Sequence, residues 1–193
     1  MAFLSVARMT TGDTLAAMLK SCLLIAALLA PCMAQQIRMP NVEVQRAAMK
    51  KLSFLVGKWS GEARMLRGPG EPVEMQQTEE VEYKLDGLIL TIEGIGRTKS
   101  DGKPVLQAFA AISYDDENGS YRMRAFNDGR YLETDLKLTD DEKGATWGFT
   151  LGSIKTSSVL RLNDKGEWTE QAEITFGAEP ARKLLQLSVR RDK

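Results

Sequence analysis

The chain has no histidine among its 193 residues. This absence excludes Ser-His-Asp and Cys-His catalysis, a histidine-ligated haem and the usual zinc sites, because each of these needs an imidazole. Any chemistry would therefore have to use Asp, Glu, Tyr, Lys, Arg or Ser side chains. We expect no metal ion and no cofactor.

The chain also lacks an excess of charge, since 26 basic and 26 acidic residues cancel. Nucleic-acid-binding domains usually carry a clustered basic excess, so we expect no nucleic-acid partner. Aromatic residues make up only 7%, and the strands predicted below carry charged residues near their centres. Both features argue against an outer-membrane barrel, which needs aromatic girdles and an apolar outer band.

The two cysteines, Cys22 and Cys32, both lie in an N-terminal segment that is typical of a secretory signal peptide. There Lys20 precedes the uncharged run SCLLIAALLA, and small residues ending at Ala34 follow it. The run is too short to span a bilayer. We therefore expect cleavage near Ala34, which leaves an exported protein, periplasmic or secreted, with neither a disulfide nor a transmembrane segment. A lipoprotein anchored through Cys32 is the alternative, but Pro31 directly before the cysteine fits that motif badly.

These features divide the chain into three parts. Residues 1–34 form the predicted signal peptide, of which 1–17 could be an extension from an upstream start codon. Residues 35–41 form a short linker. Residues 42–193 form a single domain, in which we find no internal repeat and no second linker.

A helix is predicted over residues 42–55, because Asn41 can cap its start and apolar residues recur at helical spacing. Gly57 is expected to end the helix as a left-handed C-cap, and Trp59 then opens the first strand. The apolar residues that share the helical spacing are Ala48, Leu52 and Leu55.

Beyond the helix, short turns that couple Asp, Asn or Glu to Gly divide the sequence, which is the chemistry of hairpin turns. Between these turns apolar residues recur at every second position. Consecutive antiparallel strands with short turns make a meander, and closing it into a barrel removes the unpaired edges. We therefore predict an all-β fold: an up-and-down barrel of about ten strands, with one N-terminal helix closing an end. The strands are expected at 58–66, 73–84, 88–98, 105–114, 120–127, 130–138, 145–151, 156–162, 167–176 and 183–191.

Four stretches carry a resemblance to a known superfamily: FLVGKWSGEA (54–63), YKLDGLIL (83–90), SYDDENGSYRMRAFNDG (113–129) and GEWTEQAE (166–173). The order of helix, Gly-Lys-Trp and antiparallel barrel resembles the calycins, and within them an uncharacterised bacterial group of lipocalin-like secreted domains. The likeness covers about residues 50–190 and implies a barrel with a cavity, but no reaction. Nitrobindin-type relatives hold haem through a histidine, so that activity should not transfer to this chain.

The hairpin around the Asp-Gly turn at 128–129 fixes its own register. A two-residue loop pairs Arg124 with Glu133, and Arg122 with Asp135. The opposite face of the hairpin is apolar, so we expect these ion pairs to form a ladder on the outside of the barrel. The alternative places the arginines in the lumen to bind a ligand carboxylate, but it would turn the apolar face outward.

Two carboxylates break the apolar alternation of their strands. Glu170 shares a face with Trp168, and Glu79 shares a face with Tyr83. Either these glutamates lie near a rim of the barrel, wetted or paired with Arg161, or they are polar anchors inside a mainly apolar cavity.

The predicted function is the binding or transport of a small apolar or amphipathic ligand by an exported lipocalin-like protein. One alternative is an enzyme on the same scaffold, in which Glu79, Glu170, Arg161 or Tyr83 would act. The other is an envelope accessory protein whose barrel is filled with side chains. The candidate ligand-binding residues are Glu79, Tyr83, Met123, Trp147, Arg161, Trp168 and Glu170, with Met75, Val81, Leu136 and Phe149 as further lining candidates.

An even number of strands places the last strand antiparallel to the first. Arg191 then lies beside Trp59. We expect Trp59 to pack under the helix as a plug, with Arg191, or Arg190 after a one-residue slip, over its ring, which resembles the Trp–Arg pair of lipocalins. This pair and Gly57 are predicted to be structural.

Overall fold

Alternating side chains and tight turns give the domain ten strands, each with one face turned to the core. The computed structural model describes residues 38–193 except residue 69. The predicted signal peptide and its cleavage site lie outside the described residues. The strands are β1 (Gly57–Met65), β2 (Val73–Lys84), β3 (Ile89–Thr98), β4 (Pro104–Asp115), β5 (Ser120–Asn127), β6 (Arg130–Leu138), β7 (Gly144–Leu151), β8 (Ile154–Leu162), β9 (Glu167–Phe176) and β10 (Arg182–Arg191).

The ten strands close into an antiparallel barrel in the order β1-β10-β9-β8-β7-β6-β5-β4-β3-β2. Closure occurs between the first strand and the last, where Trp59 lies opposite Arg191. The predicted all-β, ten-stranded up-and-down barrel is therefore confirmed.

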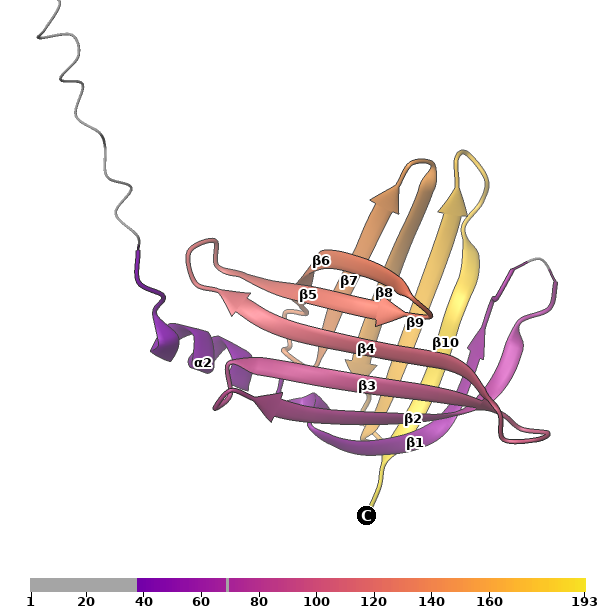
Figure 1. Ribbon diagram of the computed structural model, residues 1–193, viewed down its shortest axis with the longest axis horizontal. Coiled ribbons are helices and arrows are strands. Elements are labelled where there is room, and N and C mark those ends of the chain that lie inside the picture. Colours follow the sequence, from indigo (N-terminus) through magenta and orange to yellow (C-terminus); the bar gives the residue numbers. More distant parts are fainter. Residues whose placement is uncertain (1–37, 69) are drawn as a thin grey trace, which may run out of the picture. The chain divides into compact units, whose positions relative to one another are not determined.

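One stretch of the barrel wall is weakly joined. β6 and β7 share only three residue pairs, all at the end of β6, whereas β1 and β10 share seven. We call the unpaired stretch, 130–135 on β6 and 148–151 on β7, the β6–β7 seam. The Thr134 hydroxyl donates a hydrogen bond of 2.6 Å to the Gly148 carbonyl across it. In Figure 1 the strands β2 to β5 run across the view, whereas β7 to β10 run nearly upright, and the seam lies where the two groups diverge.

The β5–β6 hairpin has the register that its turn predicts. Arg122 lies opposite Asp135 at 2.7 Å, and Arg124 lies opposite Glu133 at 3.2 Å. Arg122 also reaches Glu133 at 3.0 Å. All four side chains retain solvent exposure, so the ladder lies on the outside of the barrel and not in the lumen.

The helix is shorter than the sequence predicts. α2 (Val42–Lys50) begins at the Asn41 cap, whose side chain accepts from the Val44 amide, and a 3-10 turn, η1 (Ser53–Leu55), follows it. The apolar face predicted over 42–55 is nevertheless real, because Leu52 and Leu55 are fully buried. No helix within 38–68 or 70–193 is long and apolar enough to cross a membrane.

The prediction that Gly57 caps the helix is wrong. Lys51 is the C-cap of α2 and has right-handed helical angles, whereas Gly57 begins β1 with a φ of 134°. A methyl group at Gly57 would lie 2.6 Å from the Arg191 guanidinium. Glycine is therefore required here for its backbone conformation and for the close approach of Arg191.

Two tyrosines fix the end of α2 to the barrel. The Tyr83 and Tyr121 hydroxyls donate hydrogen bonds of 2.7 Å to the Met49 and Ala48 carbonyls. These carbonyls at the end of the helix also accept from backbone amides, so each tyrosine adds a second hydrogen bond. At the other end of α2, Asp116 accepts from the Asn41 amide at 2.9 Å. The helix is therefore held to the barrel at both of its ends.

Trp59 plugs this end of the barrel. Its ring is 1% exposed, and its indole N–H donates to the Leu55 carbonyl at 2.7 Å. The Arg191 guanidinium carbon lies 4.2 Å from the ring centroid, and its Nη2 donates to the Phe54 carbonyl at 2.9 Å. Arg190 instead points outward and pairs with Glu167. The packing of Trp59 and Arg191 agrees with the sequence-based prediction in its unslipped register.

Candidate functional site

A band of polar side chains lines the inner wall of the barrel. These residues alternate with exposed residues on β2, β8 and β9, so they point to the core side of their strands. A buried polar group is costly unless it is hydrogen-bonded, which makes such a band a candidate site. Its members, which we call the polar band, are Gln77, Glu79, Thr156, Ser158 and Glu170.

Glu79 lies on β2 and keeps 9% of its surface exposed. The Gln77 amide nitrogen donates to its Oε1 at 2.8 Å. Its carboxyl group rests on the neighbouring strand at Gly94, where a methyl group would lie 2.7 Å from Oε2. Gly96 makes room for Gln77 in the same way. The two glycines of β3 therefore leave the space that the polar side chains of β2 occupy.

Glu170 lies on β9 and is equally buried, with 9% of its surface exposed. Its Oε1 accepts from the Ser158 hydroxyl at 2.5 Å and from the Trp147 indole N–H at 3.2 Å. Trp147 is half-buried and belongs to the last residue pair before the β6–β7 seam. Glu170 therefore lies directly behind a side chain at the border of the seam.

Burial controls the protonation of both glutamates. It raises the pKa of Glu79 from its ordinary 4.5 to about 8, the Gln77 hydrogen bond opposes the rise, and the charge of Glu170 adds to it. Burial also raises the pKa of Glu170, against the hydrogen bonds from Ser158 and Trp147. The effect of the Glu170 charge on Glu79 indicates that the two carboxyl groups share one region of the interior.

Two other polar atoms near these strands have no partner within the described part of the chain. They are the carbonyl oxygen of the Gln77 side chain and the indole nitrogen of Trp168, both fully buried. Trp168 packs edge-on against Trp59, with ring centroids 5.8 Å apart. Such unpaired groups are rare in protein interiors and call for an explanation.

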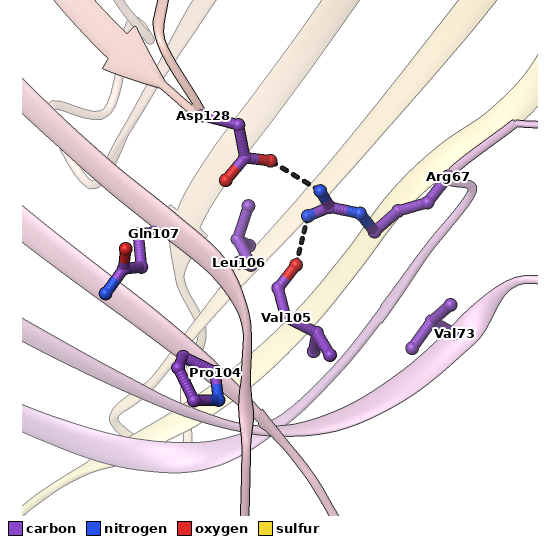
Figure 2. A pocket seen from close by; sticks show the side chains of 7 residues that line it. All are labelled: Arg67, Val73, Pro104, Val105, Leu106, Gln107 and Asp128. Atoms are coloured by element: carbon purple, nitrogen blue, oxygen red, sulfur yellow. Dashed lines mark hydrogen bonds and ion pairs between the residues drawn. The ribbon is translucent and has the colours of Figure 1, made fainter.

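A separate hollow (Figure 2) lies where β1 and β5 end and β2 and β4 begin, which is the end of the barrel away from α2. It has a volume of about 400 Å³. Arg67, from the β1–β2 loop, crosses it to bind the Asp128 carboxylate at 2.5 Å and the Val105 carbonyl. Leu106 and Val73 give it an apolar floor on the inner wall. The polar band does not line this hollow, which we call the mouth.

Most of the predicted ligand-binding residues lie on the inner wall of the barrel. Glu79 and Glu170 belong to the polar band, and both point into the barrel rather than to a wetted rim. Met123, Trp147 and Trp168 belong to the same wall; Met123 is 5% exposed and Trp168 is 2% exposed.

Two of the predicted residues lie elsewhere. Arg161 does not meet Glu170, because the β8–β9 register pairs it with Thr169 and turns it outward, where it binds Asp141. Tyr83 uses its hydroxyl to hold the end of α2. Neither side chain contributes to the polar band.

Sequence reasoning missed Gln77, Thr156 and Ser158. Each occupies a core-facing position in an alternating strand, and a polar residue at such a position is the signal that could have found them. The repeated glycine of EGIG (93–96) was a second signal, because glycine inside a strand often marks a close approach by a neighbouring group. Within 38–193, residue 69 apart, no three acidic side chains lie close enough together to hold a metal ion.

No protein-family model and no curated protein matches the chain. Among solved structures, the fold is similar to that in the crystal structure of Rv2717c from M. tuberculosis, with a TM-score of 0.58 and 15% sequence identity. The match covers 76% of this chain and 98% of the other. At this identity the likeness shows the fold alone, and a ten-stranded antiparallel barrel with this neighbour fits a calycin-like fold.

Proposed function

We propose that this protein binds a small amphipathic molecule inside its barrel, with the polar end of the molecule at the polar band and the apolar part along the neighbouring wall. The observation that carries the proposal is a pair of buried carboxyl groups, Glu79 and Glu170, on an inner wall that is otherwise largely apolar. A few convergent polar groups in an apolar lining are the usual composition of a small-molecule site.

Partial exposure of core-facing residues supports the same proposal. Ala110, Thr134, Trp147 and Phe149 lie in phase with buried neighbours on β4, β6 and β7, yet each is only half-buried. Solvent therefore reaches the inner wall on the side of the β6–β7 seam. A barrel filled with side chains, as the accessory-protein alternative requires, would bury these residues.

Neighbouring alanines of β4 provide a matched test. N-phenyl-1-naphthylamine, a neutral apolar fluorophore, should bind saturably at one site per chain. Ala110→Trp places an indole on the inner wall and should abolish or strongly weaken that binding. Ala111→Trp is the control, because Ala111 lies opposite Arg124 of the outer ladder, and it should leave binding unchanged.

Circular dichroism of both variants separates loss of the site from loss of the fold, since overpacking a core is also destabilising. Equal binding by the wild-type protein and a folded Ala110→Trp variant would contradict an interior site. Native mass spectrometry of protein from its own host would then identify what the barrel carries in the cell.

Export of the mature domain is part of the proposal and rests on the signal-peptide pattern that ends at Ala34. An exported domain without thiols has no disulfide to stabilise it, so its stability depends on non-covalent contacts such as the burial of Trp59.

An enzyme on the same scaffold is the second candidate, and one observation favours it. The pKa of Glu79, raised to about 8 by burial, would keep this carboxyl protonated at neutral pH, as a general acid requires. If the wild-type protein converts a bound molecule, and Glu79→Gln binds the same molecule without converting it, the enzyme would be favoured over the carrier.

A further inference from the structure

Hydrogen-bond acceptors outnumber donors on the polar band. Glu79 and Glu170 each use Oε1, and within 38–193, residue 69 apart, no hydrogen bond reaches the Oε2 of either. The side-chain oxygen of Gln77 is also without a donor, although the residue is only 2% exposed. Each glutamate keeps 9% of its surface exposed, and neither unpaired Oε2 atom is fully buried, so both remain accessible. A molecule that brings donors would satisfy oxygens that the protein leaves unmatched.

Positive charge is missing from the same wall. The buried polar and charged residues of the described chain include two glutamates but neither lysine nor arginine. Arg191 covers Trp59 at the helix end, Arg67 is engaged at the mouth, and Arg161 points outward. A ligand carboxylate would therefore find no counter-charge in the barrel and would be repelled by any ionised glutamate.

We propose that the barrel selects molecules with a protonated amine and an apolar tail, and that Glu79 and Glu170 determine this specificity. The proposal rests on the function proposed above and names the ligand class of that same site. An ammonium group carries three donors and one positive charge, which suits the unpaired Oε2 atoms of the two acids. The apolar tail lies along the half-buried wall of β4 to β7.

Proton release makes the proposal measurable. An alkylammonium, like a lysine, loses its proton only near about pH 10.4, so it stays charged throughout the neutral range. Binding it as a carboxylate–ammonium pair requires Glu79 to lose the proton that burial otherwise retains. Amine affinity should therefore rise with pH, by at most about tenfold per unit below the Glu79 pKa and little above it. A neutral alcohol of the same length should show no such rise.

The experiment compares octylamine, octanol and octanoate by calorimetry at about pH 6.5 and 8.5, pH values that bracket the expected change. We expect octylamine to bind most tightly, with affinity at least tenfold higher at the upper pH, and octanoate to bind most weakly. Glu79→Gln and Glu170→Gln should each lower octylamine affinity at least tenfold and leave octanol affinity within twofold. Glu133→Gln is the control, because Glu133 belongs to the outer ladder, and it should change neither.

Two results would overturn the amine specificity while leaving the binding function intact. One is octanoate or octanol binding as tightly as octylamine in the wild-type protein. The other is octylamine binding that neither glutamine variant weakens. If none of the three compounds binds and N-phenyl-1-naphthylamine does not bind either, the interior site itself is refuted.

Discussion

Replacing Glu79 by glutamine keeps the shape of the side chain and removes its ability to ionise. In the wild-type protein the unfolded chain loses the Glu79 proton near its ordinary pKa of 4.5, whereas the folded chain keeps it up to about 8. Below the lower value both states are protonated, and stability does not depend on this group. Between the two values the folded state loses stability as pH rises, and above the upper value the loss is complete.

The size of the effect follows from the shift. A difference between 4.5 and about 8 corresponds to a loss of up to about 5 kcal/mol between acidic and mildly alkaline conditions. Glu79→Gln should therefore have almost the same stability as the wild-type protein near about pH 4.5, and be several kcal/mol more stable above about pH 8. Glu170 also has a raised pKa, so the variant should keep part of the pH dependence in the same direction.

Urea unfolding followed by tryptophan fluorescence, at a series of pH values across this window, measures the difference. Glu133→Gln is the control. Hydrogen bonds from Tyr131 and Arg122 lower the pKa of Glu133. The stability that Glu133 contributes is therefore lost only at pH values below the ordinary glutamate pKa, and it stays constant through this window. Parallel stability profiles for wild type and Glu79→Gln would show that Glu79 titrates as a solvated acid, and the description of Glu79 as a largely buried acid would be refuted.

Three further predictions concern the plug, the ladder and export. Trp59→Ala should lower the free energy of unfolding by roughly 3–5 kcal/mol because it empties a fully buried site, whereas loss of the stacking in Arg191→Ala should lower it by only about 0.5–2 kcal/mol. Equal losses in urea unfolding would show that burial of the Trp59 ring is not the main contribution. Arg124→Ala should leave the unfolding midpoint and fluorophore binding unchanged, because exposed ion pairs contribute little; a large loss of binding would mean that this strand faces the lumen. Intact-mass measurement of exported protein should give a chain that begins at Gln35, and the mass of the uncut chain or of a lipidated Cys32 would refute the cleavage site.

Local chemistry was enough to predict the architecture. The turns that couple acidic or amide residues to glycine marked the strand ends, and the two-residue loop at 128–129 was enough to pair Arg124 with Glu133. Closure was predicted because it removes unpaired strand edges, and the even number of strands then placed Arg191 beside Trp59. The turns and the hairpin register depend on residues that are close in sequence, and the direction of the last strand depends only on whether the number of strands is even. Both can therefore be predicted from the sequence.

The wrong predictions concern residues whose role depends on contacts with residues far away in the sequence. Gly57 looked like a helix cap, but Arg191, which comes from the last strand, explains its role. Arg161 was a possible partner of Glu170 because the 163–166 turn left the register open. In the structure Asn163 accepts from the Lys165 and Glu167 amides, and this turn pairs Leu162 with Trp168, which directs Arg161 outward. Residue type alone could not determine how this turn folds.

Closure through β1 and β10 also has a consequence for how the chain folds. The hairpins between consecutive strands form from residues close in sequence, but the ladder that joins Trp59 to Arg191 needs the two ends of the domain to meet. Contacts of such long sequence separation carry a large entropic cost and slow folding. Glu79 and Glu170 become largely buried only at this late step, so they must give up most of their water then. The barrel should therefore close more slowly at alkaline pH, where the carboxyl groups of the open chain are ionised, than at mildly acidic pH.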